Sequence, residues 1–259
     1  MCELFAMASR FPTDVRASLE AFARHGGPEG RHKDGWGIAY YADEDVRLVK
    51  DAEPALGSAC VRFLKEHPFA SGIVLSHIRH GTQGRMAMKN CQPFTRELGG
   101  RMHVFAHNGD LDPGALRAAA PLRAFRPVGD TDSEYAFCAL LERLRPAWRG
   151  RAAPSLTDRL GIVARFAAAL RPMGPANFLY TDGGALFIHA HKRQQGDGGP
   201  PRAPGLYLLA RSCAPGQEVL LAASVPLTRE PGWRALGEGE LLVARQGALV
   251  DFAAAVAEP

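Results

Sequence analysis

Short runs of apolar residues, bounded by glycine, proline or acidic residues, recur along most of the chain. Runs of roughly four to eight branched and aromatic residues are typical of β-strands. The pattern predicts strands at residues 36–41, 46–50, 72–79, 102–107, 176–180, 186–191, 206–211, 219–223 and 241–243. Apolar positions instead recur with helical spacing at residues 14–24, 55–66, 132–144 and 155–170.

The order of these elements indicates the fold class. The predicted helices at 132–144 and 155–170 follow each other and interrupt the series of strands. This order favours helices layered on antiparallel sheets over a doubly wound parallel fold, so we predict an α+β protein. Residues 178–186 carry Asp-Gly-Gly between two apolar runs, which predicts a β-hairpin. The Gly- and Pro-rich stretch 194–204 predicts a mobile surface loop. No sharp boundary divides the chain, and we expect a single domain spanning residues 2–259.

Composition excludes several classes of protein. Apolar residues make up 46% and charged residues 22% of the 259 residues, which is ordinary for a globular chain. The net charge is +4 without a basic run, so nothing predicts binding to nucleic acid or a membrane surface. No apolar run approaches the ~18 residues of a membrane-spanning helix, and the start lacks a secretory signal pattern. The five cysteines form no C-x-x-C pair, so we expect a reducing, cytoplasmic location.

The residue after the initiator methionine is the most informative position in the chain. Removal of Met1 would give Cys2 both a thiol and a free α-amine. An α-amine has a pKa of about 7.7–8.0, so near neutral pH it can act as general base for the thiol. Cys2 is therefore a candidate nucleophile. The alternative is that Cys2 is only a small apolar residue opening a first strand.

Further motifs lie at the edges of the predicted elements. Asp34-Gly35-Trp36-Gly37 leads into the first predicted strand, and His-Ile-Arg-His-Gly-Thr places Arg79 where the strand at 72–79 ends. Asn108-Gly109 follows the strand at 102–107, and Thr-Asp-Ser-Glu places Asp132 at the start of a helix. Each motif alone is a weak signal, whereas all of them in this order, together with Cys2, are specific.

In this order the motifs resemble those of class II glutamine amidotransferases. The matching segments are MCELF, DGWGI, HIR, NCQPF, AHNG and TDSE, between Met1 and about Cys138. The DGWG form resembles the small stand-alone branch, which contains the ergothioneine-pathway amidohydrolase and the glutathione-degrading amidotransferase subunit. The resemblance implies the N-terminal-nucleophile hydrolase fold, a four-layer αββα sandwich of two antiparallel sheets.

The resemblance also implies roles for particular residues. Cys2 would attack the γ-carboxamide of a glutamine-like substrate and form a γ-glutamyl thioester. The Asn108 side-chain amide and the Gly109 backbone N–H would form the oxyanion hole. Arg79 would bind the substrate α-carboxylate and Asp132 the α-ammonium group. Thr82 matches a position that contacts the substrate amino acid.

Each of these residues also has a simpler interpretation. Asn108-Gly109 is typical of a tight turn between strands. Arg79 is compatible with a surface arginine at a strand end. Residues 131–134 form a capping-box pattern, in which Asp132 favours the helix dipole. Thr131 can cap the helix while Asp132 faces a site, so the two interpretations of this segment are compatible.

The sequence departs from the large synthases of the family in two ways. His80 stands where the synthases carry a tryptophan on a loop that closes over glutamine, which puts such closure in doubt. No synthase domain follows, because the residues after Cys138 are needed to complete the sandwich. Transfer of ammonia would therefore require a separate synthase subunit.

No cofactor or metal is predicted. His189 with His191, and His103 with His107, share strand faces, but no cysteine or carboxylate stands beside them at ligand spacing. Neither phosphate-loop pattern occurs. We do not expect residues after Gly174 to take part in the chemistry.

The motifs together predict an enzyme that hydrolyses a γ-glutamyl amide bond, with glutamine giving glutamate and ammonia as the leading reaction. One alternative is hydrolysis of a γ-glutamyl peptide or conjugate. Another is a non-catalytic glutamine-binding subunit that retains Met1, so that Cys2 has no free α-amine.

Overall fold

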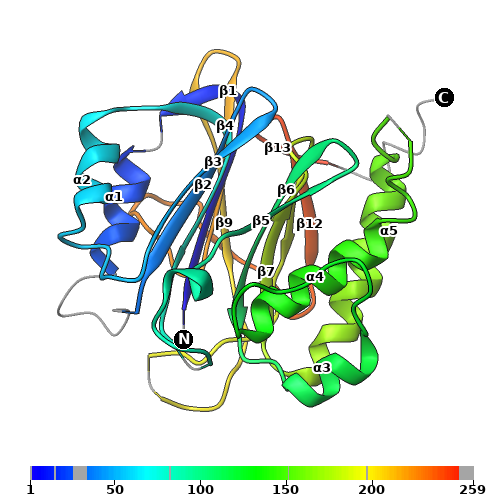
Figure 1. Ribbon diagram of the computed structural model, residues 1–259. Coiled ribbons are helices and arrows are strands. Elements are labelled where there is room, and N and C mark those ends of the chain that lie inside the picture. Colours follow the sequence, from blue (N-terminus) through cyan, green and yellow to red (C-terminus); the bar gives the residue numbers. More distant parts are fainter. Residues whose placement is uncertain are drawn as a thin grey trace.

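Two antiparallel sheets face each other at the centre of the molecule (Figure 1). The computed structural model describes residues 2–14, 16–25, 34–81, 83–150, 152–196 and 198–250. The seven-stranded sheet has the order β11-β9-β10-β1-β4-β2-β3, and the six-stranded sheet the order β13-β12-β8-β7-β6-β5. The strands of the first are β1 (Glu3–Asp14), β2 (Trp36–Ala42), β3 (Asp45–Asp51), β4 (Ala70–Ile78), β9 (Tyr207–Ala214), β10 (Gln217–Ala223) and β11 (Arg234–Ala235). Those of the second are β5 (Phe94–Leu98), β6 (Arg101–Gly109), β7 (Ala176–Thr181), β8 (Leu186–His189), β12 (Leu241–Arg245) and β13 (Ala248–Leu249).

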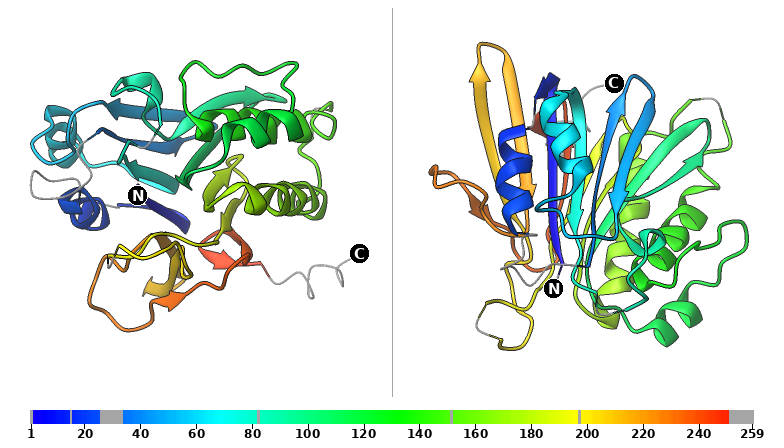
Figure 2. Two further views of the ribbon diagram at one scale, coloured as in Figure 1. Left: turned by 90° about the horizontal axis from the view of Figure 1, so that it is seen from below. Right: turned by 60° about the vertical axis from the view of Figure 1, so that its left-hand side comes forward.

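Helices cover the outer face of each sheet (Figures 1 and 2). Two cover the seven-stranded sheet, namely α1 (Arg16–His25) and α2 (Ala59–Glu66). Three cover the six-stranded sheet, namely α3 (Pro113–Ala119), α4 (Asp132–Leu144) and α5 (Leu156–Leu170). The 3-10 turns are η1 (Met88–Asn90) and η2 (Arg171–Met173). The predicted α+β class and the four-layer αββα order are confirmed.

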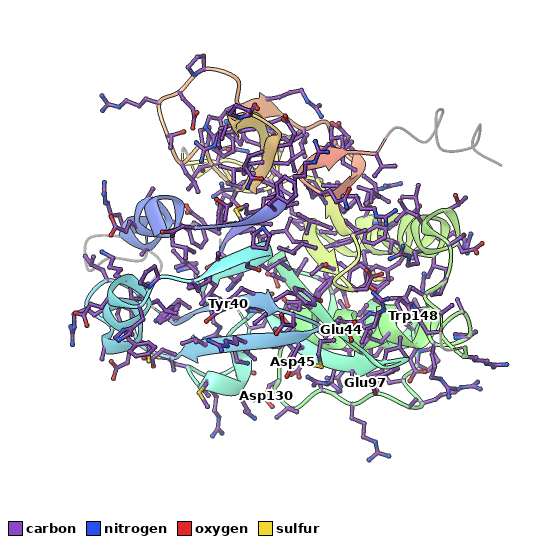
Figure 3. All side chains as sticks on the ribbon, turned by 90° about the horizontal axis from the view of Figure 1, so that it is seen from above. Tyr40, Glu44, Asp45, Glu97, Asp130 and Trp148 are labelled. Carbon is purple, nitrogen blue, oxygen red and sulfur yellow. The ribbon has the colours of Figure 1, made fainter. Side chains whose placement is uncertain are left out.

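Three apolar layers hold the four layers of structure together. Side chains alternate between the two faces of a strand, so Leu4 and Ala6 of β1 pack between the sheets while Phe5 and Met7 pack under α1 and α2. Figure 3 looks down on the end remote from Cys2 and labels Tyr40 and Trp148, which belong to the two outer layers.

The structure differs from the predicted elements at several points. The sequence pattern does not predict β1, because residues 4–8 (LFAMA) form a short apolar run without β-branched residues, which periodicity alone does not distinguish from a buried helix segment. Helix α2 begins four residues later than predicted, since Gly57 has a φ of +95°. β8 ends at His189, because beyond it the N–H of His191 is bound by the Asn177 side chain. The short elements β5 and α3 were also not predicted.

The Gly- and Pro-rich stretch lies between β8 and β9, as expected. Arg193 and Arg202 close it through a pair of backbone hydrogen bonds of 3.1 and 3.0 Å. The Gln195 side chain donates to the carbonyl oxygens of Arg202 and Pro204. In the described part of the chain, no helix has the length and apolar character needed to cross a membrane.

Candidate active site

Strand pairing brings Cys2 and Arg79 to the same end of the seven-stranded sheet. Ile78 of β4 pairs with Glu3 on one side and with Trp36 on the other. Cys2 and Arg79 each lie one residue beyond these pairs. The register of three neighbouring strands therefore places two of the predicted site residues side by side.

Arg79 is held by backbone carbonyl groups rather than by an acidic side chain. Its guanidinium donates to the carbonyl oxygens of Asp34 (3.3 Å), Gln83 (2.8 Å) and Gly84 (3.1 Å). The side chain is only 4% exposed. A Cβ on Gly81 would lie 3.2 Å from three guanidinium atoms, so the backbone at Gly81 covers the group. These neutral partners orient the guanidinium and leave its positive charge available to a bound anion.

The DGWG motif supports this arrangement. The N–H of Arg79 donates to the carbonyl of Gly35 (2.8 Å), and the Asp34 carboxylate accepts the N–H of Gly81 (2.7 Å). Gly35 has a φ of +119°, and a Cβ there would collide with the sulfur of Cys91. Glycine is therefore required at this position.

The Cys2 thiol lies against the backbone of His80. Its Sγ accepts the N–H of His80 (3.2 Å) and lies 3.3 Å from the His80 carbonyl oxygen. Burial raises the pKa of this thiol, although the His80 N–H and the charge of Arg79 act in the opposite direction. The thiol is therefore protonated at neutral pH and needs a base before it can act as a nucleophile.

Asn108 and Gly109 lie within β6, paired with Asn177 and Ala176 of β7, and do not form the turn considered as an alternative. The Asn108 Nδ2 donates to the carbonyl oxygen of Cys2 (2.5 Å) and to Oγ of Ser224 (3.1 Å). Its Oδ1 is buried and has no hydrogen-bond partner among the described residues. A Cβ on Gly109 would collide with the carbonyl oxygen of Pro175, so only glycine fits there.

Asp132 occupies the first turn of α4. Thr131 caps this helix by accepting the N–H of Glu134 (3.2 Å). The Asp132 Oδ2 accepts the N–H of Leu111 (2.9 Å), which anchors the carboxylate beside the end of β6. Glu134 pairs with Arg96 (2.5 Å) and accepts the N–H groups of Val128 and Gly129. It therefore stabilises the loop that precedes α4.

One small pocket collects these groups. Its empty volume is about 300 Å³, and its lining includes Cys2, Arg79, Gly109 and Asp132. Asn108 lies behind Cys2 and is not part of the lining. Thr82 lies outside the described residues. The structure thus gathers a thiol, a guanidinium, a carboxylate and a glycine backbone around one cavity.

The pocket also contains residues to which the sequence assigned no role in catalysis or substrate binding. They are His80, Gly81, Gln83, Asn90, Gln92, His107, Thr131 and Ser133. His107 is bound at both nitrogens, by Ser133 Oγ (2.9 Å) and the Pro175 carbonyl (3.3 Å), and burial lowers its pKa. Gln83 bonds Asp110 and the carbonyl of Leu111, which connects the Arg79 loop to the Asp132 side. The sequence signal for Gln83 was weak, because nothing local relates it to residues 110–111.

The paired histidines have other partners. His103 bonds Tyr180 Oη (2.8 Å) and the carbonyl of Leu98 (3.1 Å), and His189 bonds the carbonyl of Ala176 (2.7 Å). His191 lies 3.2 Å from Glu238. Across the described ranges, no three His, Cys, Asp or Glu side chains meet in a group suited to a metal ion.

Comparison with known proteins identifies the family of this chain. The family model for class-II glutamine amidotransferases matches residues 1–201. The chain is 35% identical to "Putative glutamine amidotransferase YafJ" of Escherichia coli K12, over 93% of this chain and 96% of that protein. A crystal structure titled as a predicted glutamine amidotransferase from Pseudomonas aeruginosa has a TM-score of 0.71 and 30% identity, covering 96% of this chain and 100% of that one.

A more distant structure shows the same fold in a longer protein. The glutamine phosphoribosylpyrophosphate amidotransferase of Bacillus subtilis has a TM-score of 0.62 at 16% identity, over 96% of this chain and 48% of that chain. The extent of the family match and the identity to relatives of similar length settle the classification. This chain belongs to the class-II glutamine amidotransferases.

Proposed function

We propose that this protein hydrolyses the γ-carboxamide of glutamine through a thioester on Cys2, within a single domain spanning residues 2–259. The observation that carries the proposal is the shared pocket of Cys2, Arg79 and Asp132. A thiol between an arginine and a carboxylate matches the three functional groups of glutamine, namely its amide, its α-carboxylate and its α-ammonium group.

The raised pKa of the Cys2 thiol explains why a second group on the same residue is needed. After removal of Met1 the α-amine of Cys2 takes the thiol proton and the sulfur attacks the amide carbon. The amine then returns a proton to the leaving nitrogen, which departs as ammonia. Water hydrolyses the thioester and releases glutamate. His107 is unsuited to act as this base, because both its nitrogens are engaged and burial holds its pKa low.

Arg79 and Asp132 fix the α-carbon end of the substrate. A guanidinium has five N–H donors, so Arg79 can donate to a carboxylate besides the three backbone carbonyls, and charge-assisted bonds are about twice as strong as neutral ones. The Oδ2 of Asp132 accepts the N–H of Leu111, whereas its Oδ1 has a long contact of 3.4 Å with Ser133 Oγ. The carboxylate therefore has capacity to accept an ammonium group.

Asn108 and Gly109 stabilise the oxyanion that forms when the thiol adds to the amide. Asn108 directs one amide hydrogen at the carbonyl of Cys2, beside the reacting residue. We infer that this N–H is shared with the oxyanion in the transition state. Stabilisation of a charge that exists only in the transition state raises kcat rather than affinity.

Glutamine is the leading substrate because its amide, α-carboxylate and α-ammonium groups match the thiol, guanidinium and carboxylate that line the pocket. Hydrolysis of a larger γ-glutamyl conjugate is the alternative. We further propose that any acceptor of the ammonia binds to a separate synthase subunit. The longer B. subtilis relative, of which this chain covers 48%, shows how much additional protein a related amidotransferase contains.

The test is glutamate release by protein whose mass proves that Met1 is absent. Glutamine, glutathione and simple γ-glutamyl amines are offered side by side to the wild type and to Cys2→Ala. Cys213→Ala removes an exposed thiol and serves as the matched control. We expect turnover of glutamine by the wild type and the control alone. Preference for a conjugate would replace the substrate assignment, and activity of Cys2→Ala, or retention of Met1 with no turnover, would favour a binding subunit.

A further inference from the structure

Ser224 connects the strand that follows Cys2 with the side chain of Asn108. Its backbone N–H donates to the carbonyl of Leu4 (3.0 Å), and its Oγ accepts the N–H of Leu4 (2.9 Å). The same Oγ accepts a hydrogen bond from Nδ2 of Asn108 (3.1 Å). Ser224 and Asn108 are fully buried. A residue from the last third of the chain thus contacts the proposed oxyanion hole.

Arg193 holds Ser224 from the opposite side. Its Nη1 donates to the Ser224 carbonyl (2.6 Å), and its Nη2 lies 3.9 Å from Oε1 of Glu3, the residue after Cys2. The side chains of Arg193 and Glu3 are 9% and 8% exposed. Replacing a buried ion pair by apolar residues is often neutral or stabilising. Stability alone therefore does not explain the Arg193–Glu3 pair beside Cys2, and we infer that it serves to hold Ser224 in position.

The amide of Asn108 requires such support. Rotation about χ2 of asparagine is broad and roughly two-fold, so no rotamer well fixes the amide plane. One Nδ2 hydrogen is bound by Ser224, and the other is directed at the carbonyl of Cys2. The bond to Ser224 sets the plane in which the second hydrogen faces Cys2.

We propose that Ser224 and Arg193 are positioning residues for the oxyanion-stabilising amide of Asn108. The inference rests on the proposed function, since it needs Cys2 as nucleophile and Asn108 as donor. Neither residue touches the substrate. Without Ser224 Oγ the amide turns about χ2, and without the Arg193 guanidinium the Ser224 carbonyl loses its anchor. Both changes weaken stabilisation of the transition state while the thiol and the substrate clamps stay in place.

Two reagents separate this role from a merely structural one. Iodoacetamide alkylates the Cys2 sulfur by displacing iodide, and no oxyanion forms. The γ-semialdehyde of glutamate instead accepts the sulfur at its carbonyl carbon. The carbonyl oxygen becomes an alkoxide and takes up the thiol proton, which gives a hemithioacetal. The Asn108 amide assists only the second reaction.

The variants are Ser224→Ala and Arg193→Met, with Arg193→Lys as the conservative change. We expect kcat for glutamine to fall about 10–100-fold and the inhibition constant of the semialdehyde to rise by a similar factor. KM and the rate of alkylation stay within about twofold of the wild type. Arg193→Lys gives an intermediate loss. Arg211→Ala, which removes a half-buried pair of Arg211 on β9 with Glu230, changes none of these values.

The inference is overturned if kcat is unchanged, or if kcat and alkylation fall together. Thermal melting identifies a variant that does not fold, and Ser224→Cys then replaces Ser224→Ala because its thiol still fills the site but is a weaker acceptor. Failure of the proposed function gives a different result. In that case the wild type releases no glutamate, or Cys2→Ala remains active, whatever the variants at 193 and 224 do.

Discussion

Cys2 and Arg79 lie side by side because each stands one residue beyond the pair formed by Glu3 and Ile78 in strands β1 and β4. Strand register, rather than loop conformation, therefore sets the separation between the proposed nucleophile and the proposed carboxylate clamp. A shift of one residue would turn every side chain of β1 to the opposite face. Since both faces of β1 are buried, the apolar packing that stabilises the sheets also fixes this site.

Arg79→Lys keeps the positive charge but loses the planar guanidinium that the backbone carbonyls of Gln83 and Gly84 orient. A charge-assisted hydrogen bond contributes about 1.5–3 kcal/mol, so we expect KM for glutamine to rise about 10–100-fold. Alkylation of Cys2 by iodoacetamide should continue at the wild-type rate, which shows that the thiol is intact. An unchanged KM would refute the assignment of Arg79 to the α-carboxylate.

Asp132→Asn retains an oxygen for the Leu111 N–H while removing the negative charge. We expect KM for glutamine to rise about 10–100-fold, because the α-ammonium group loses its ionic partner. Glutaramate, which is glutamine without the α-amino group, provides the comparison. Its kcat/KM should be the same in wild type and variant. A similar loss for both substrates would mean that Asp132 acts only on the structure of α4.

Asn108→Ala removes one of the two proposed oxyanion donors. Loss of one such donor costs about 10²–10³ in rate, so we expect kcat to fall by this factor with KM within about threefold. Steady-state kinetics measure both, and thermal melting confirms that the variant is folded. A fall in kcat of less than about tenfold would remove Asn108 from the oxyanion hole.

Stability should decrease on acidification because of two buried histidines. Burial lowers the pKa of His103 and of His189 to about 4, whereas an unfolded imidazole titrates near ~6.5. Between these values the unfolded chain binds protons that the folded protein does not. The free energy of unfolding is therefore highest above about pH 6.5 and falls as the pH drops towards 4.

At pH 5 each histidine accounts for about 2 kcal/mol of this loss, from the 1.36 kcal/mol per pKa unit. Urea unfolding at pH 7 and pH 5 measures the loss in the wild type and in His189→Asn. We expect a smaller loss in the variant by about that amount. His67→Asn, at an exposed position, is the control and should behave as the wild type. Equal losses in all three proteins would contradict the prediction.

Asp182→Asn leaves a buried arginine without its counter-ion. Asp182 Oδ2 lies 2.6 Å from Nη1 of Arg159, and the two side chains are 0% and 8% exposed. Breaking a buried pair costs about 3–5 kcal/mol, so urea unfolding should show a loss of that size. The double variant Asp182→Asn, Arg159→Met should recover part of it. Lys65→Gln, which breaks an exposed pair with Glu20, should cost less than about 1 kcal/mol.

Much of the fold could be predicted from local sequence patterns. Strands such as β2 and β7 are short apolar runs bounded by turn residues, and α4 begins where Thr131 can cap it. β1 was not predicted, for a physical reason. It lies at the centre of its sheet with residues 4–8 buried on both faces, and this short apolar run has no β-branched residues to distinguish a buried strand from a buried helix segment.

The candidate site was predictable only where a motif is local. Cys2, Arg79 and Asp132 each lie within a short recognisable segment, and the structure places them around one pocket. Ser224 and Arg193 carry no such segment. Ser224 reaches Asn108 because it follows β10, which pairs with β1. Arg193 acts through one hydrogen bond from its guanidinium to the Ser224 carbonyl. Such contacts between distant segments leave no periodic signal in one sequence.

The bond between Leu4 and Ser224 also has a consequence for the order in which the protein is made. These residues are 220 positions apart, so during translation the segment carrying Cys2 waits while the rest of the two sheets is synthesised. β1 cannot take its place between β4 and β10 until β10 has left the ribosome. Cys2, the proposed nucleophile, is therefore synthesised long before Ser224, and a nascent chain carries Cys2 without the surroundings proposed to make it reactive.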